Sequence, residues 1–180
     1  MNITLEKFAD LAALVEGQAP LADSLDHGTS HWRAVARTGL ELCSRTPDAD
    51  PRLILLFALL HDSRRVNEFA DPDHGPEAAR YLTTLRKEGI INLSNEDSTT
   101  LAYAMYHHDA GETSDDLTIA ACWDADRLQL QRLGYWLKNE LLSNPLSHTL
   151  EVQELVSSYH ESDELSWGDL FIQAQALCSR

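Results

Sequence analysis

The feature of the sequence that most restricts the fold is the segment from Leu53 to Asp62, LILLFALLHD, in which eight consecutive apolar residues precede a histidine and an aspartate. A run without a polar face is typical of an element buried on all sides, and this length favours the central helix of an α-helical domain over a strand. His61 and Asp62 then lie where desolvation costs free energy unless hydrogen bonds or a cation compensate for it. The pair alone still favours a plain helix end, with His61 capping carbonyl groups and Asp62 in a solvated turn, because a metal site needs several ligands.

Amphipathic patterns on either side of this segment predict an all-α protein, a single compact bundle of several helices. With 180 residues, 43% of them hydrophobic, the chain can bury a substantial core, and one domain over residues 1–180 is expected. The residues with the potential to bind metal fall between residues 26 and 134, and residues 135–180 are interpreted as helical scaffold. The expected helices cover residues 3–15, 31–43, 53–62, 77–87, 95–108, 117–133, 135–142, 150–159 and 165–177.

The net charge of the chain restricts its binding partners, and its cysteines and apolar segments bear on the cellular compartment in which it is expected. The formal charge of −15 repels nucleic acid backbones and anionic membranes, so neither a duplex nor a membrane is an expected partner. A small phosphorylated ligand remains compatible with this negative charge, because a cation and nearby arginines can make the electrostatic potential inside a cleft positive. No apolar run approaches the roughly 18 residues of a membrane span and no signal-peptide pattern is present, so we expect a soluble, cytoplasmic protein. Cys43, Cys122 and Cys178 are far apart and odd in number, and we expect them to be reduced and buried.

Several further histidines fall in or beside predicted helices. His31 lies on the face along which its helix packs, and His107 and His108 end another helix. His74 stands in the loop DPDHG directly before a helix, where an exposed loop histidine and a ligand are equally expected. His27 is interpreted as a turn residue or a neighbour of the ligands.

Two aspartates belong to the predicted helix at residues 117–133. Asp126 shares a helical stripe with Ile119, Trp123 and Leu130, so it is an anion on a core-facing surface. A buried carboxylate without a partner is strongly penalised, and a cation or several donors must meet it. Asp124 points elsewhere and is expected to be solvated.

Taken in order, His31, the doublet His61-Asp62 and the distant Asp126 resemble the ligand pattern of the HD-domain superfamily of metal-dependent phosphohydrolases. The resemblance implies an HD-like helical bundle in which these four residues bind one divalent ion. The segments that carry it, and that look like a bacterial HD subgroup of largely uncharacterised function, are HGTSHW at 27–32, LFALLHDSRR at 56–65, DPDHG at 71–75 and CWDADRL at 122–128.

In members of the superfamily with two metals, histidines from the middle helices complete a second site. Here His74, with His107 or His108, fits those positions. The resemblance favours His108, because relatives tend to have a histidine three residues before the glycine, here Gly111. Relatives also often have an arginine three residues after the first ligand histidine, where this chain has Ala34.

This ligand set suits one or two ions of Mn, Fe, Co, Ni or Zn and contains too much nitrogen for a dedicated Mg or Ca site. The resemblance implies a hydrolase that cleaves a small phosphate ester, such as a nucleotide, with a metal-activated water. Asp62 is expected to orient that water, with Arg64 and Arg65 as further catalytic residues. The same two arginines and Arg127 are the candidates for binding the phosphoryl oxygens.

Two other functions are compatible with the pattern. An HD-type di-iron oxygenase uses a similar set of six ligands to activate dioxygen. A nucleotide- or metal-sensing module without turnover is the non-enzymatic alternative, and Ala34 in place of the arginine mildly favours it. The sequence gives no indication of the oligomeric state.

Overall fold

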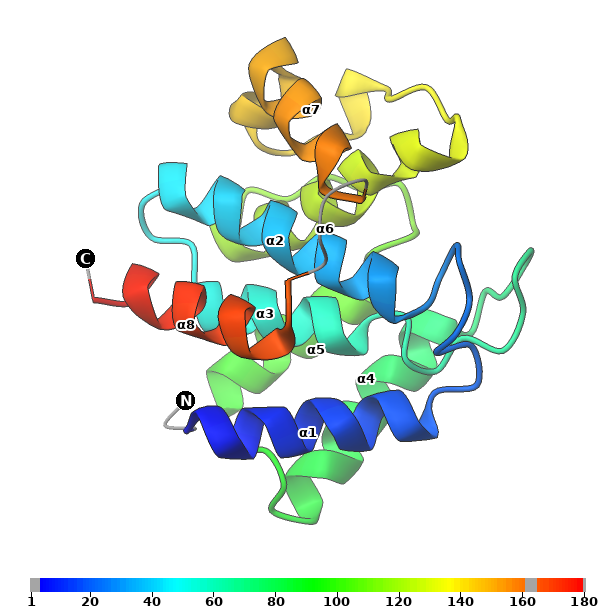
Figure 1. The fold of residues 1–180 in the computed structure, drawn as a ribbon, viewed down its shortest axis with the longest axis vertical. Coiled ribbons are helices and arrows are strands. Elements are labelled where there is room, and N and C mark those ends of the chain that lie inside the picture. Colours follow the sequence, from blue (N-terminus) through cyan, green and yellow to red (C-terminus); the bar gives the residue numbers. More distant parts are fainter. Residues whose placement is uncertain (1–3, 161–164, 180) are drawn as a thin grey trace.

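The apolar run forms the central helix of the protein. In the computed structural model, which describes residues 4–160 and 165–179, helix α3 (Pro51–Leu60) begins after Asp50, whose side chain accepts hydrogen bonds from the backbone N–H groups of Arg52 and Leu53. All residues from Leu53 to Leu60 are buried. Because α3 contacts five other helices, its end is enclosed by elements that are distant in sequence (Figure 1).

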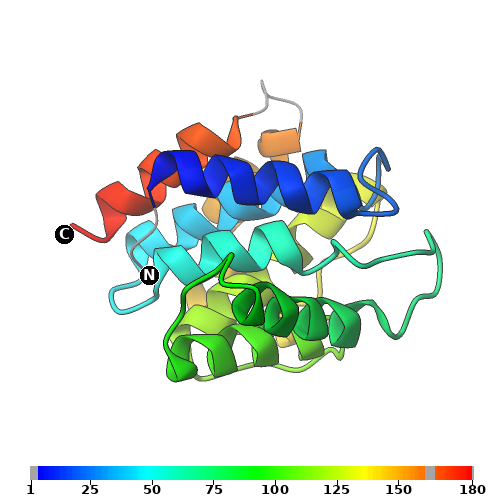
Figure 2. The ribbon, with the colours of Figure 1, turned by 90° about the horizontal axis from the view of Figure 1, so that it is seen from below.

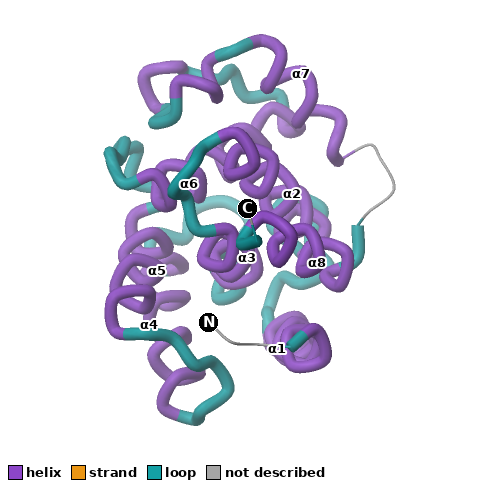
Figure 3. Tube along the Cα trace, turned by 90° about the vertical axis from the view of Figure 1, so that its left-hand side faces the viewer, coloured by secondary structure: helices purple, strands orange, loops and turns teal. Residues whose placement is uncertain are grey.

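The described residues form an all-α bundle without strands. Figure 3 shows α3 near the middle, with α2 and α8 on one side and α4 and α5 on the other. Seen from below, α1 lies on one side of α3 and the pair α4 and α5 lies on the opposite side (Figure 2). The other α-helices are α1 (Leu5–Gln18), α2 (Thr29–Arg45), α4 (His74–Lys87), α5 (Asn95–His107), α6 (Leu117–Gln129), α7 (Leu150–Ser157) and α8 (Trp167–Leu177), and the 3-10 helices are η1 (Leu130–Leu133), η2 (Asn139–Leu141), η3 (Pro145–His148) and η4 (Ser158–His160).

The C-terminal part of the chain completes the core. The Phe8 ring of α1 stacks on Phe171 of α8 with centroids 5.2 Å apart, and it meets the edge of Trp167 at 6.1 Å. Helix α8 also packs on α2 and α3. None of the helices in the described ranges is long and apolar enough to cross a membrane.

The prediction of a helix at residues 135–142 is wrong. Only the short η2 forms there, because Gly134 ends η1 in the left-handed region at φ 80° and the chain turns away from the helical path. The α-helix predicted at 117–133 ends earlier than expected, at Gln129, because residues 130–133 form the 3-10 helix η1 instead.

The expectation that Asp124 is solvated is also wrong. Its side chain is fully buried and accepts hydrogen bonds of 2.7 Å from the backbone N–H groups of Ser143 and Asn144. The segment after η2 folds back over α6, which removes the carboxylate from water. Among the cysteines, Cys43 and Cys122 are buried free thiols as expected, whereas Cys178 is exposed near the end of the last helix.

Close packing of α2 against α3 requires a glycine, and this supplies a test of the fold. A Cβ atom at Gly39 would lie 2.5 Å from Cγ2 of Ile54, whereas one at Gly17 of α1 would meet no atom within 4 Å. We expect Gly39→Ala to lower the free energy of unfolding by about 1–3 kcal/mol through overpacking. Gly17→Ala should raise it by about 0.5 kcal/mol, because alanine loses less backbone entropy in a helix. Urea denaturation followed by circular dichroism measures both, and equal stabilisation by the two substitutions would contradict the close contact.

Candidate metal centre

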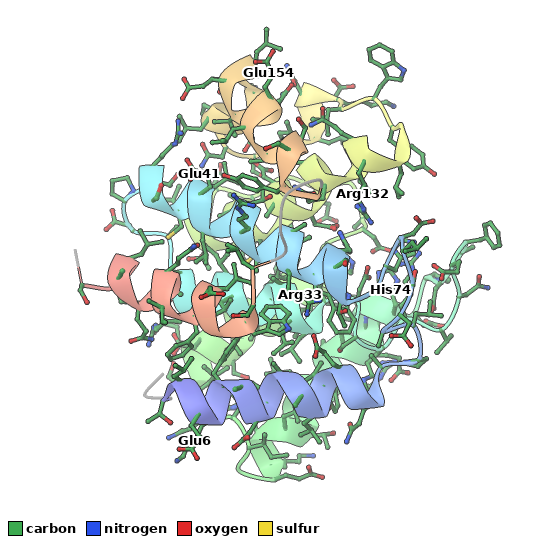
Figure 4. All side chains as sticks on the ribbon, in the orientation of Figure 1. Glu6, Arg33, Glu41, His74, Arg132 and Glu154 are labelled. Carbon is green, nitrogen blue, oxygen red and sulfur yellow. The ribbon has the colours of Figure 1, made fainter. Side chains whose placement is uncertain are left out.

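Five helix ends bring histidines and aspartates together at one end of α3. His31 lies in the first turn of α2, and Asp126 lies in the last turn of α6. His61 is the C-cap of α3 and Asp62 follows it, so the end of the apolar run directs both polar side chains into the interior. His74 is the first residue of α4, not a loop residue before it, and Figure 4 shows it beside the loops that precede α2 and α4. His108 caps the C-terminus of α5.

The first group of donor atoms consists of Nε2 of His31, Nε2 of His61, Oδ2 of Asp62 and Oδ1 of Asp126. The His31 nitrogen lies 3.4 Å from His61, 3.8 Å from Asp62 and 3.2 Å from Asp126. The His61 nitrogen lies 3.7 Å from Asp62 and 3.6 Å from Asp126. Ligand atoms about 2.1 Å from one ion are about 3.0 Å apart along an octahedral edge and about 3.4 Å apart in a tetrahedron. The donor atoms of His31, His61 and Asp62 are close enough together to hold a single ion, and Oδ1 of Asp126 lies beside both imidazole nitrogens.

The second group uses the other oxygen of Asp62. Its Oδ1 lies 3.3 Å from Nε2 of His74 and 3.8 Å from Nε2 of His108, and these two nitrogens are 2.8 Å apart. Asp62 thus presents one carboxylate oxygen to each group. Both sets of buried side chains, His31-His61-Asp62 and Asp62-His74-His108, could hold a metal ion.

Backbone carbonyls orient three of the four imidazoles. Nδ1 of His61 lies 3.2 Å and 3.1 Å from the carbonyl oxygens of Phe57 and Ala58, and Nδ1 of His108 lies 2.7 Å from that of Met105. Nδ1 of His74 contacts the carbonyl oxygen of Asp71 in the same way. Since a carbonyl only accepts hydrogen bonds, each Nδ1 carries a proton and Nε2 is the nitrogen that faces the cluster. Nε2 is therefore the atom through which each of these imidazoles could bind a metal.

Burial and the two carboxylates determine the charge of the cluster. Burial lowers the pKa of His31 to about 4, so its imidazole is neutral near pH 7. Burial alone would raise the pKa values of Asp62 and Asp126, but the surrounding histidines hold both well below the usual range. Burial would lower the pKa of His108, yet the nearby carboxylates of Asp62 and Asp126 raise it to about 9. The carboxylates thus attract positive charge into the site, in the form of a proton or a metal ion.

The cluster opens into a cleft of about 280 Å³. Its wall includes His27, whose Nδ1 lies 3.4 Å from Oδ2 of Asp62, as expected for a neighbour of the ligands. It also includes three arginines. Arg65 places Nη1 3.7 Å from Oδ1 of Asp62, and Arg127 and Arg132 line the side formed by α6 and η1.

Two of the residues predicted for the site lie elsewhere. The Arg64 guanidinium lies over the Tyr81 ring, 3.7 Å from its centroid, and does not line the cleft, because successive residues of the turn after α3 point in different directions. His107 packs against Tyr103 and Tyr106 on the outer side of α5, whereas its neighbour His108 enters the cluster. Arg127 lines the cleft, but its guanidinium donates to the carbonyl oxygens of Leu141 and His108.

Sequence reasoning missed Arg132. In a continuous α-helix this residue would point about 120° away from Asp126. The three steps from Gln129 to Arg132 follow 3-10 geometry instead, which reduces the difference in direction to about 60°. No feature of the sequence indicates this change from α-helix to 3-10 helix. Arg132 is held at the cleft by hydrogen bonds to the carbonyl oxygens of Gln129 and Asp26.

Comparisons of the chain with protein-family models, with curated proteins and with solved structures find no match.

Neighbouring histidines provide a matched test of the site. We expect His108→Ala to weaken metal binding by more than about 100-fold, because it removes a donor from the cluster. His107→Ala should leave the metal content unchanged. Elemental analysis of protein purified without chelator measures this, with circular dichroism as the control for folding. Equal metal content in the two variants would contradict the assignment of the second group.

Metal should also stabilise the fold, because the donor atoms converge only in the folded chain. At a free metal concentration about 100 times Kd, linkage predicts an increase of about 2.7 kcal/mol in the free energy of unfolding. Chelator should remove this increase, and Asp62→Ala should abolish it. Thermal denaturation with and without Mn²⁺ or Zn²⁺ tests the expectation, which fails if Asp62→Ala responds to metal as the unmodified chain does.

Proposed function

We propose that the protein is a metal-dependent phosphohydrolase that cleaves a small phosphate ester. The observation that carries the proposal is the combination of two donor groups sharing Asp62 with arginines in the same cleft. The resemblance of the His31, His61-Asp62 and Asp126 pattern to the HD-domain superfamily supports the same reaction. The site, not the fold alone, is the basis of the argument.

The donor set indicates the class of metal. The first group offers two imidazoles and two carboxylates, and the second offers two imidazoles and the shared carboxylate. Such nitrogen-rich sites favour Mn, Fe, Co, Ni or Zn over Mg and Ca. A divalent ion held there supplies Lewis acidity, which brings the pKa of water towards neutrality and polarises a phosphoryl oxygen.

Asp62 and Arg65 have distinct tasks in this proposal. The ionised carboxylate of Asp62 would help to hold the ion and would orient a water molecule by accepting a hydrogen bond from it. Arg65 is fixed at the wall of the cleft, since its Nε and Nη2 donate to the carbonyl oxygens of Asn67 and Phe69 at 3.1 and 3.2 Å. Its Nη1 is directed towards the second donor group, where it stabilises negative charge that develops on the phosphoryl oxygens.

A pair of iron ions would suit the same donors, so a di-iron oxygenase is the competing enzyme. The arginines distinguish the two functions, because guanidinium groups match phosphate oxygens in geometry and charge. Dioxygen consumption by protein with two irons and no release of phosphate would favour the oxygenase. Ligand binding without turnover under all metals would favour the sensing module.

Adjacent arginines allow a controlled test of the proposal. A phosphate-release screen over nucleotides and sugar phosphates, with each metal in turn, identifies a substrate. With that substrate, Arg65→Gln should lower kcat/KM by about 100-fold or more, because it removes a charged donor from the transition state. Arg64→Gln, which changes a guanidinium outside the cleft, should have an effect of less than about threefold. Equal losses in both variants, or unchanged turnover in Arg65→Gln, would contradict the assigned role.

A further inference from the structure

Two side chains of α6 hold the C-terminal turn of α5, the turn that carries His108. Nε1 of Trp123 donates a hydrogen bond of 2.8 Å to the carbonyl oxygen of Ala104. Nη2 of Arg127 donates one of 3.3 Å to the carbonyl oxygen of His108. The last carbonyl groups of an α-helix lack donors within the helix, so donors from elsewhere stabilise its end. Trp123 and Arg127, one turn apart on α6, supply such donors to α5.

The same guanidinium also holds a segment that follows α6 along the chain. This segment, residues 139–144, is drawn in yellow in Figure 1 and is called the strap below. Nη1 of Arg127 donates to the carbonyl oxygen of Leu141, a residue of the strap that lines the metal cleft. Three residues earlier on α6, Asp124 accepts hydrogen bonds of 2.7 Å from two backbone N–H groups of the strap. Arg127 therefore joins the strap to the end of α5.

Electrostatics alone does not explain an arginine at this position. Arg127 is buried and lines the cleft, and its positive charge repels any cation bound at the cluster. The planar fork of a guanidinium can donate to two separate acceptors at once, which the ammonium of a lysine does less well. The contacts with two carbonyl oxygens, one on α5 and one on the strap, use this property.

The second donor group depends on the position of the His108 backbone. Nδ1 of His108 lies 2.7 Å from the carbonyl oxygen of Met105, one turn earlier on the same helix. This contact orients the ring relative to α5, so Nε2 moves with the end of that helix. A shift of the helix end would change the spacing of this nitrogen from Nε2 of His74, now 2.8 Å, and from Oδ1 of Asp62, now 3.8 Å.

We propose that Arg127 is a positioning residue of the metal centre, which holds His108 at the second donor group and ties the strap to it. This role differs from the phosphate binding that the sequence pattern predicts for Arg127. It rests on the metal centre of the proposed function but not on hydrolysis. Residues that orient metal ligands from outside typically contribute about 10- to 100-fold to metal affinity.

Cobalt binding tests this role without requiring turnover. Protein freed of metal by a chelator is titrated with Co²⁺ in a calorimeter, and the visible absorption of Co²⁺ reports the geometry of its ligands. We expect the unmodified protein to bind two ions, and His74→Ala identifies the step that belongs to the second donor group. Arg127→Met and Arg127→Lys should each weaken that step by about 10- to 100-fold, alter its absorption and leave the other step unchanged.

The two substitutions separate positioning from charge. Loss of a nearby positive charge would by itself strengthen the binding of a cation, so weaker binding in Arg127→Met is opposite in sign to the electrostatic effect. Arg127→Lys keeps the charge but loses the fork that reaches both carbonyl oxygens. If Arg127→Met does not fold, Arg127→Lys still decides the question, and circular dichroism monitors the folding of both.

Arg86→Met is the matched control. Nη2 of Arg86 also donates to a backbone carbonyl oxygen, that of Leu93 at 3.1 Å, but Arg86 does not line the cleft. Urea denaturation should show a loss of stability in this variant as well, whereas both steps of Co²⁺ binding should be unchanged. An equal loss of Co²⁺ affinity in Arg86→Met and Arg127→Met would overturn the proposal, because the loss would then follow stability alone.

The other outcomes separate this inference from the proposed function. Binding of a single Co²⁺ by the unmodified protein, or an unchanged second step in both Arg127 variants, would overturn the positioning role. Unchanged Co²⁺ binding together with a raised KM for a phosphate ester would instead assign Arg127 to phosphate binding. A weakened second step in both variants, with no phosphate release by the unmodified protein, would support the positioning role and refute the hydrolase.

Discussion

The arrangement of the whole site depends on the burial of one ionised carboxylate. Asp62 is only 4% exposed, and its oxygens lie between 3.3 and 3.8 Å from nitrogens of five histidines: His27, His31, His61, His74 and His108. A buried anion is strongly destabilising unless positive charge or donors surround it. Imidazoles from four helix ends and one loop converge on this carboxylate and supply those donors.

Close helix contacts make that convergence possible. The apolar surface of α3 is covered by its neighbours, which fixes the position of His61 and Asp62 at its end. At the other side of the cluster, a Cβ atom at Gly75 would lie 2.6 Å from the carbonyl oxygen of Met105. The glycine lets α4 approach α5 closely enough for His74 and His108 to meet. Small residues at helix contacts thus bring together donor atoms that lie far apart in the sequence.

Much of this could be predicted from the sequence, because periodicity and burial are encoded locally. The run at 53–60 identifies the central helix, and the position of Asp126 on an apolar stripe identifies an anion that needs a partner. The all-α fold is confirmed. Long-range packing is not encoded in this way: the burial of Asp124 depends on a segment about twenty residues later in the chain, and the direction of Arg132 depends on a local change to 3-10 geometry. Arg64 and Arg65 are indistinguishable by pattern, although only one of them lines the cleft.

The most direct test of the shared carboxylate is anomalous diffraction at the absorption edge of the metal that copurifies with the protein. The account predicts an anomalous peak about 2.0–2.2 Å from Nε2 of His31 and His61 and from one oxygen of Asp62. A second peak, if both groups are filled, should lie at the other oxygen of Asp62 beside His74 and His108. Metal bound only outside this cluster, with the five imidazoles and Asp62 linked by hydrogen bonds alone, would contradict it.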